Sequence, residues 1–359
     1  MQTKTKNFIN AFGFSFLVTV LCLGLSFYWG SWNGVYIAAV LGVLEVSLSF
    51  DNAVVNASVL KEMSEKWQKI FLTVGILIAV VGMRLVLPVL VVALAADVGL
   101  WETAKMALYN PEQYSHHLNS AHIQIAVFGG VFLLLVFFDF IFGEREHLWL
   151  GPLERLAFRV GKVDSISVVL SLGAVLAVQY VVPDASKLAA LLSGIFGIIL
   201  FILVQSLDQL FSVQEQEEHA DDEGQAGQAD NKGQAGPVAQ ATRSGIMGFL
   251  YLEVLDASFS FDGVIGAFAI TKDVVIIMLG LAIGAMFVRS MTVYLVKQGT
   301  LGEYIYLEHG AHYAIGILGG VMMVSTVYHI PEWITSLVGV LFIILSVMSS
   351  IYEKKRQPV

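Results

Sequence analysis

Hydrophobic residues occur along this chain in long runs that short polar segments separate. A helix needs about 20 mainly apolar residues to cross the ~30 Å hydrocarbon core of a bilayer. Ten runs approach or exceed this length, at residues 8–28, 34–58, 69–95, 121–142, 166–182, 187–211, 245–270, 273–296, 312–328 and 333–351. We therefore predict an all-α fold, a polytopic bundle of ten transmembrane helices.

Composition supports a membrane protein. Of the 359 residues, 57% are hydrophobic and 14% are charged, whereas soluble domains average roughly 45–50% apolar and about 25% charged residues. The surplus apolar surface has to face lipid, so the lipid bilayer is an expected partner and a soluble globular protein is excluded. The formal net charge of −9 reflects an acidic stretch in mid-chain, and no nucleic-acid partner is expected.

The acidic stretch, residues 212–243, is polar and simple in composition, with Gly-Gln-Ala repeated. Such a segment cannot bury enough apolar surface to fold. We predict a disordered linker between a first transmembrane half, residues 1–211, and a second, residues 244–359. A metal-sensing tail around His219 is an alternative interpretation, although charge runs of this kind are usually only solvated.

Lysine and arginine in short loops predict the orientation, because these residues are retained on the cytoplasmic side of a membrane. If all ten runs cross the membrane, the following basic residues lie on one side of it: Lys4, Lys6, Lys61, Lys66, Lys69, Arg145, Arg155, Arg159, Lys162, Lys354, Lys355 and Arg356. The loops on the other side carry few positive charges. Both termini and the linker are then cytoplasmic.

A pattern of acids and serines occurs twice. Residues 45–52 read Glu-Val-Ser-Leu-Ser-Phe-Asp-Asn, and residues 256–263 read Asp-Ala-Ser-Phe-Ser-Phe-Asp-Gly. The next span of each half carries one arginine, Arg84 or Arg289, and a later Ala-His pair precedes a Gly-Gly pair at the same spacing in both halves. Because the repeats lie five spans apart, they cross in opposite directions. The sequence thus predicts an inverted repeat, which is typical of transporters.

The acids of this repeat outnumber the arginines. An isolated charge at the bilayer centre costs at least ~2.5–3.5 kcal/mol on insertion scales, so an intramembrane acid is a functional candidate. Glu45, Asp51, Glu253, Asp256 and Asp262 are five, and Arg84 and Arg289 are two, which leaves three carboxylates without a counter-charge. A divalent cation or protons would compensate them.

These residues form a candidate ion site. We assign metal binding to Glu45, Asp51, Asn52, Asp256 and Asp262, supporting contacts to Ser49, Ser260 and Glu253, and charge balance to Arg84 and Arg289. At ~100° per residue most of these positions, with Asn56, share one helix face in each half. Asp51 and Asp262 lie off those faces unless the Ser-x-Ser-Phe-Asp stretch unwinds.

Oxygen ligands without thiolate suit a hard cation such as magnesium, calcium or manganese. This cation would be the cargo, and no resident cofactor is expected. In the alternative interpretation, the acids and serines only hold helices together through hydrogen bonds and ion pairs. His122 and His312, at the entrances of their spans, could gate or relay protons near neutral pH, or could serve as interfacial anchors.

The motif around Glu45 and residues 48–53, Leu-Ser-Phe-Asp-Asn-Ala, resembles the first signature of the TerC family of integral membrane proteins, and residues 256–271 resemble the second. With its mid-chain linker, the chain is similar to a long bacterial branch without an assigned function. The resemblance implies a bacterial inner-membrane location, an association with tellurite resistance and, in some members, manganese export. It matches the family's acidic signature to the five metal-binding positions assigned above. The second signature departs from the family, because residues 262–266 lack its usual proline, which leaves the helix break and the choice of ion open.

We therefore expect a transporter for a divalent cation, most specifically a manganese exporter linked to tellurite or metal stress, and not an enzyme. One alternative is a membrane scaffold that binds stress-response partners through the linker. The other is an intramembrane enzyme with paired aspartates, but Ser260-Phe261-Asp262 lacks the Gly-x-Gly-Asp of intramembrane aspartyl proteases. A homo-oligomer is compatible with the sequence.

Overall fold

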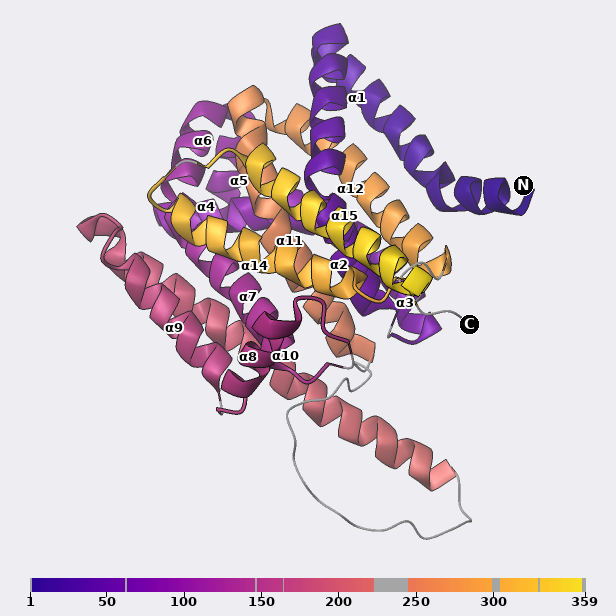
Figure 1. The fold of residues 1–359 in the computed structure, drawn as a ribbon. Coiled ribbons are helices and arrows are strands. Elements are labelled where there is room, and N and C mark those ends of the chain that lie inside the picture. Colours follow the sequence, from indigo (N-terminus) through magenta and orange to yellow (C-terminus); the bar gives the residue numbers. More distant parts are fainter. Residues whose placement is uncertain are drawn as a thin grey trace.

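The computed structural model describes the backbone of residues 2–61, 63–145, 147–163, 165–222, 245–298, 304–328 and 330–356. Within these ranges every regular element is a helix and there is no strand (Figure 1). The predicted all-α fold is thus confirmed for the part of the chain that the structure describes.

The first helix, α1 (Gln2–Leu48), contains a sharp reversal. Gly30 (φ −126°, ψ 16°) and Ser31 (φ 54°, ψ −152°) leave the helical conformation, and two arms of α1 meet at an apex in Figure 1. This reversal falls in the turn expected between runs 8–28 and 34–58. The second run differs from the prediction, because the helix breaks at Ser49 (φ −104°, ψ 21°) before α2 (Phe50–Leu60) begins.

The third predicted span is a distorted helix. It consists of α3 (Glu65–Leu77), a π-helical segment η1 (Ile78–Val86) and α4 (Leu87–Ala96). The portions Glu65–Gly75 and Ile78–Leu94 are bent by 44° relative to each other. A π-helix widens the turn and is often found at functional sites, and Arg84 lies within this one.

The remaining predicted spans occur as helices in the predicted order, and the described residues contain three short α-helices between them that were not predicted. The first half continues with α5 (Leu100–Tyr109), α6 (Pro111–Ser120), α7 (His122–Phe142), α8 (Gly151–Val160), α9 (Ile166–Val178), the 3₁₀ turn η2 (Asp184–Ser186) and α10 (Lys187–Asp222). The second half contains α11 (Gly245–Ile270), α12 (Val274–Gln298), α14 (Leu307–Ser325) and α15 (Glu332–Arg356). Because α10 continues to Asp222, residues 212–222 are helical, although they were expected to be part of the disordered linker. The rest of the linker lies outside the described residues.

The two halves share one core. Helix α1 packs along α12, α7 packs between α14 and α10, and α2 contacts α12 and α14. Gly130 of α7 lies so close to α14 that a Cβ at this position would lie 3.0 Å from the carbonyl oxygen of Gly319. Gly130 and Gly319, one glycine from each pair, thus allow close helix packing. The helices of the two halves interleave, so that the candidate site lies where they meet.

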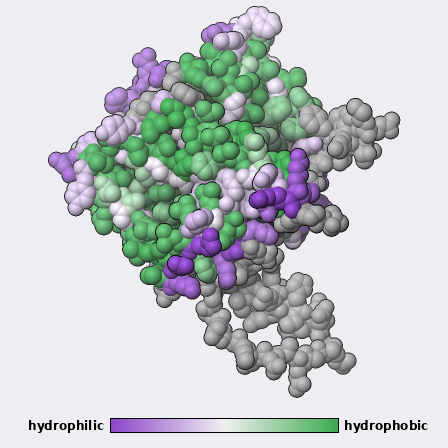
Figure 2. Space-filling model, viewed as in Figure 1, coloured by the Kyte–Doolittle hydropathy of each residue, from purple (hydrophilic) through white to green (hydrophobic). Residues whose placement is uncertain are grey.

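The outside of the bundle is largely apolar. Exposed large hydrophobic side chains are concentrated on α1, α9, α10 and α15, and Figure 2 shows hydrophobic residues over most of the visible face. Soluble monomers rarely expose contiguous apolar surface of this extent. Together with the apolar helices described next, this surface indicates a membrane protein.

Five described helices are long and apolar enough to cross a membrane, or six when the bent pair α3–α4 is included. They are Phe12–Leu48, His122–Phe142, Asp184–Ser206, Val274–Lys297 and Leu337–Arg356, with Glu65–Gly75 plus Ile78–Leu94 as the bent pair. The first of them contains the reversal at Gly30 and Ser31, which the prediction counted as a boundary between two spans. The predicted ten spans and the inverted repeat are not confirmed by this count and stay predictions.

Candidate ion site

The carboxylate of Glu45 forms a buried ion pair in the first half. Glu45 lies near the end of α1, and Arg84 of η1 donates a hydrogen bond from Nη2 to Glu45 Oε1. Arg84 also donates from Nη1 to the carbonyl oxygen of Ala79, five residues earlier, at 2.6 Å. Both side chains of the pair are at least 95% buried. The π-helical segment therefore presents its only cation to the end of α1.

The second half contains a corresponding pair between α12 and α11. Arg289 donates from Nη2 to Glu253 Oε1 at 3.2 Å and from Nη1 to the carbonyl oxygen of Phe71 at 2.6 Å. Its guanidinium lies over the ring of Phe71, 4.0 Å from the centroid. Asp256 Oδ2 is 4.0 Å from the same Nη2. One arginine thus faces two carboxylates, and its hydrogen-bond partner is Glu253 although the sequence repeat aligns Asp256 with Glu45.

A hydrogen bond joins residues of the two repeats. Asn52 of α2 donates from Nδ2 to Asp256 Oδ1 of α11 at 3.2 Å, and both side chains are buried. Residues of the two repeats, which lie 204 positions apart, therefore meet inside the bundle. This contact is the one expected if both repeats contribute to a single site.

Two glycines make room for the carboxylates. A Cβ at Gly75 would lie 2.6 Å from Glu253 Oε1, and a Cβ at Gly263 would lie 2.7 Å from Glu45 Oε2. Real Cβ atoms do not approach oxygen this closely, so alanine at either position would displace an acid. Neither glycine was predicted from the sequence to belong to the site. Gly263 follows Asp262 in the second repeat, which was the available signal.

Several buried oxygen atoms of α2 and α11 have no hydrogen bond within the described part of the chain. They are Glu253 Oε2, Asp256 Oδ2, Asn56 Oδ1 and Ser260 Oγ. A buried polar atom without a partner costs about 1–3 kcal/mol, and more when it is charged. A cation, a proton or water would satisfy these atoms. Their chemistry, carboxylate, amide and hydroxyl oxygen, fits the hard cation predicted from the sequence.

The structure joins six of the predicted residues in two groups, which are the pair Glu45 and Arg84 and the set Asn52, Asp256, Glu253 and Arg289. Ser49 occupies the break between α1 and α2, and Ser260 is buried on α11. Asp51 and Asp262 belong to α2 and α11, but their side chains lie outside the described residues. Within the described part, no three His, Cys, Asp or Glu residues are placed to hold a metal ion. The predicted five-residue metal set therefore stays a prediction.

The two predicted gating histidines lie at opposite ends of α7. His122 is the first residue of α7. His312 of α14 stacks on Phe140, near the last turn of α7, with 3.8 Å between ring centroids, and its Nδ1 is 2.9 Å from the carbonyl oxygen of Glu308. Opposite ends are what an inverted repeat requires of equivalent residues. Packing against Phe140 also fits the alternative role of an anchor.

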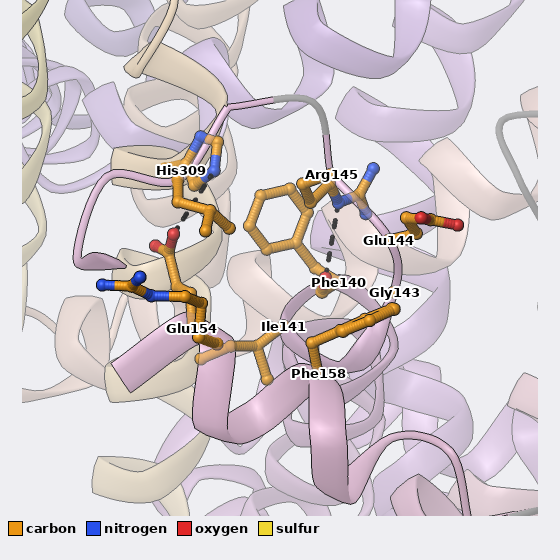
Figure 3. Close-up of a pocket in the computed structure, with 10 residues that line it drawn as sticks. Phe140, Ile141, Gly143, Glu144, Arg145, Glu154, Phe158 and His309 are labelled. Atoms are coloured by element: carbon orange, nitrogen blue, oxygen red, sulfur yellow. Dashed lines mark hydrogen bonds and ion pairs between the residues drawn. The ribbon is translucent and has the colours of Figure 1, made fainter. Parts of the chain in front are cut away.

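A second buried polar cluster was missed by the sequence analysis (Figure 3). Glu154 of α8 accepts hydrogen bonds from Tyr313 Oη (3.0 Å) and from the backbone N–H of Trp149 (2.8 Å). His309 Nε2 lies 4.0 Å from Glu154 Oε2. The cluster adjoins a cavity of about 130 Å³. The segment that forms α8 was predicted to be a loop between spans. Its one signal for a buried cluster was Glu154, an acid among basic residues.

Comparison with known proteins gives one match. No curated protein and no solved structure is similar to the chain. The family model described as "Protein of unknown function (DUF475)" matches residues 50–357, from the start of α2 to just beyond α15. This match does not establish the resemblance to the TerC family. It does cover most of the chain, which therefore belongs to the DUF475 family of proteins of unknown function.

Proposed function

We propose that this protein is a membrane transporter for a divalent metal cation, and that manganese moving out of the cell is its specific substrate. The observation that carries the proposal is the excess of buried negative charge. Glu45, Glu253 and Asp256 face only Arg84 and Arg289 in the described ion pairs. The sequence repeats contain two further acids, Asp51 and Asp262, whose side chains lie outside the described residues. A divalent cation bound among these oxygens would compensate the excess.

The backbone supports transport rather than a purely structural role. Many transporters bind their ions where helices are broken near the midplane, and here a break separates α1 from α2 at Ser49, four residues after Glu45. The π-helix around Arg84 is a second irregularity in the same region. Helix α11, in contrast, continues through Ser258 and Ser260 without a break. The acids of the first repeat thus lie beside a helix break, whereas those of the second repeat lie on a continuous helix. Such a difference between repeats is expected when an alternating-access protein occupies one of its two states.

The choice of manganese rests on oxygen chemistry and on the resemblance to the TerC family. Cys22 is the single cysteine of the chain. The chain therefore cannot supply the several thiolate ligands that favour copper(I) and zinc. We further propose the bacterial inner membrane as the location, with ten spans in an inverted repeat. The test is uptake of radioactive manganese into everted membrane vesicles with and without the protein, in which export from the cell is measured as uptake. Equal uptake by both vesicle types would contradict the proposed function.

The proposed topology predicts which surface residues an external reagent can reach. In a Cys22→Ala background, Asn110→Cys should react with a membrane-impermeant thiol reagent added to intact cells, because the α5–α6 turn lies outside. Asp230→Cys should react only in everted vesicles, because the linker is cytoplasmic. Reaction of both from the same side would exclude the inverted repeat, since the two halves would then run parallel.

A further inference from the structure

Helix α8 is a short surface helix between two apolar helices. It follows α7 and precedes α9, and it lies near the end of α7 in Figure 1. Its inner side packs tightly, because a Cβ at Gly161 would lie 2.4 Å from the carbonyl oxygen of Phe142. Glu154 on the same side is 95% buried and bonds to Tyr313 and Trp149. The helix is therefore held against the bundle at the point where the apolar span α7 ends.

The outer side of α8 has two neighbouring surfaces. Leu153, Leu156 and Val160 are 51%, 58% and 39% exposed, and at ~100° per residue they share one face. Arg155 and Arg159 are exposed on the next face around the helix. A helix with exposed leucines beside basic residues is typical of the membrane interface, where its apolar face enters the boundary of the acyl chains.

The basic residues of α8 are available to a partner. Arg155 donates from Nε to the carbonyl oxygen of Gly151 at 3.0 Å, but neither Arg155 nor Arg159 takes part in any ion pair of the described residues. The acid of the helix, Glu154, faces the bundle. Figure 3 shows Glu144, an exposed acid before the helix, on the far side of Arg145 from Glu154. Two further acids, at positions 146 and 164, lie outside the described residues.

The cavity next to α8 combines the same two properties. Phe140, Ile141 and Phe158 form apolar walls. The charged and polar residues of the lining are Arg145, Arg155, Glu144, Glu154 and His309, and of these Glu154 is already bonded to Tyr313 and Trp149. Arg145 lies over the ring of Phe140, 4.2 Å from its centroid, and donates to the Phe140 carbonyl oxygen at 3.4 Å (Figure 3). Basic pockets between helix ends are the places where anionic lipid headgroups bind. An anionic phosphate group at the rim and the first carbons of an acyl chain inside would match this lining.

We propose that α8 and the adjoining cavity bind the headgroup of an anionic phospholipid in the leaflet that the end of α7 reaches. Arg155 and Arg159 attract the phosphate, Arg145 closes the rim, and the leucine face enters the lipid. This proposal rests on the protein being in a membrane and not on the identity of a transported ion. It adds a specific lipid to the general expectation of contact with a bilayer.

The test uses the full chain in vesicles, with a fluorophore attached at Leu156→Cys in a Cys22→Ala background. Quenching is compared between phosphatidylglycerol and phosphatidylcholine, each brominated near the carbonyl end of its acyl chains and present at equal mole fraction. We expect stronger quenching by the anionic lipid. The variant Arg155→Gln/Arg159→Gln should reduce this preference by roughly 25-fold, because each of the two cations near an anionic surface adds about a factor of five. The control is Lys354→Gln/Lys355→Gln, two exposed cations at the end of α15 on the same predicted side.

Each other outcome contradicts the proposal. If neither lipid quenches the fluorophore, α8 does not lie at the bilayer surface. If the arginine variant keeps the preference, the headgroup is not held by these residues. If the α15 control loses it equally, the preference reflects the overall charge of that side. Arg155, Arg159, Lys354 and Lys355 are exposed, and the substitutions at Leu156 and Cys22 are common to all the proteins compared. The glutamine variants should therefore fold like their parent, and manganese uptake need not be measured at all.

Discussion

Replacing Asp256 with asparagine should reduce manganese uptake into everted vesicles at least tenfold, at a near-normal amount of protein in the membrane. The variant keeps the shape of the side chain and an oxygen that can accept the hydrogen bond from Asn52. Arg289 keeps Glu253 as its hydrogen-bond partner, so no buried cation loses its counterion. What the variant loses is one negative charge of the site, and a carboxylate holds a divalent cation more strongly than a neutral amide does.

The same substitution at Asp51 and at Asp262 should have an equally large effect, because these aspartates occupy matching positions in the two repeats. Ser49→Ala and Ser260→Ala should weaken uptake without eliminating it, since a hydroxyl is a weaker ligand. Asp139→Asn is the matched control, because Asp139 is an exposed acid near the end of α7. Full uptake in all three site variants would remove the carboxylate site, and loss at Asp51 or Asp262 alone would keep a site but contradict its symmetry.

Replacing Arg289 with alanine should lower the amount of folded protein before it changes any preference for an ion. Breaking a buried ion pair leaves an uncompensated charge and typically costs ~3–5 kcal/mol. Here the change also leaves the carbonyl oxygen of Phe71 without the guanidinium that donates to it at 2.6 Å. Arg84→Ala should act in the same way on Glu45. The measurement is the quantity and thermal stability of monodisperse protein extracted from equal amounts of membrane.

The double variant Glu253→Gln/Arg289→Gln separates charge from packing. Because it removes both charges of the pair, it should recover a large part of the stability that Arg289→Ala loses. Arg356→Ala, at the exposed end of α15, is a control arginine variant outside these ion pairs. The contrary outcome is an Arg289→Ala protein of normal quantity and stability whose preference among manganese, magnesium and calcium is altered. That result would place the arginine in the path of the ion and contradict a role in charge balance.

Some helix boundaries could be predicted from hydrophobic runs alone. The run 245–270 coincides with α11, and the run 121–142 differs from α7 by one residue. The runs do not show how the backbone is arranged inside a span. The run 34–58 contains the break at Ser49 and the run 69–95 contains a π-helix, because hydropathy records which residues avoid water and not how their backbone groups are bonded. In the linker, polar composition predicted disorder up to a point where α10 still continues.

By itself the sequence determined that the chain is helical and apolar enough for a membrane, and that acids and arginines recur in matched spans. These properties follow from residue types and their spacing, which are local. Only the tertiary structure decided that Arg289 bonds to Glu253 rather than to Asp256, that Asn52 reaches Asp256, and that Gly75 and Gly263 make room for the acids. Such choices depend on how α2, α3, α11 and α12 pack. Two carboxylates one helical turn apart are equivalent in a sequence pattern, but their distances to a partner on another helix differ by several ångströms.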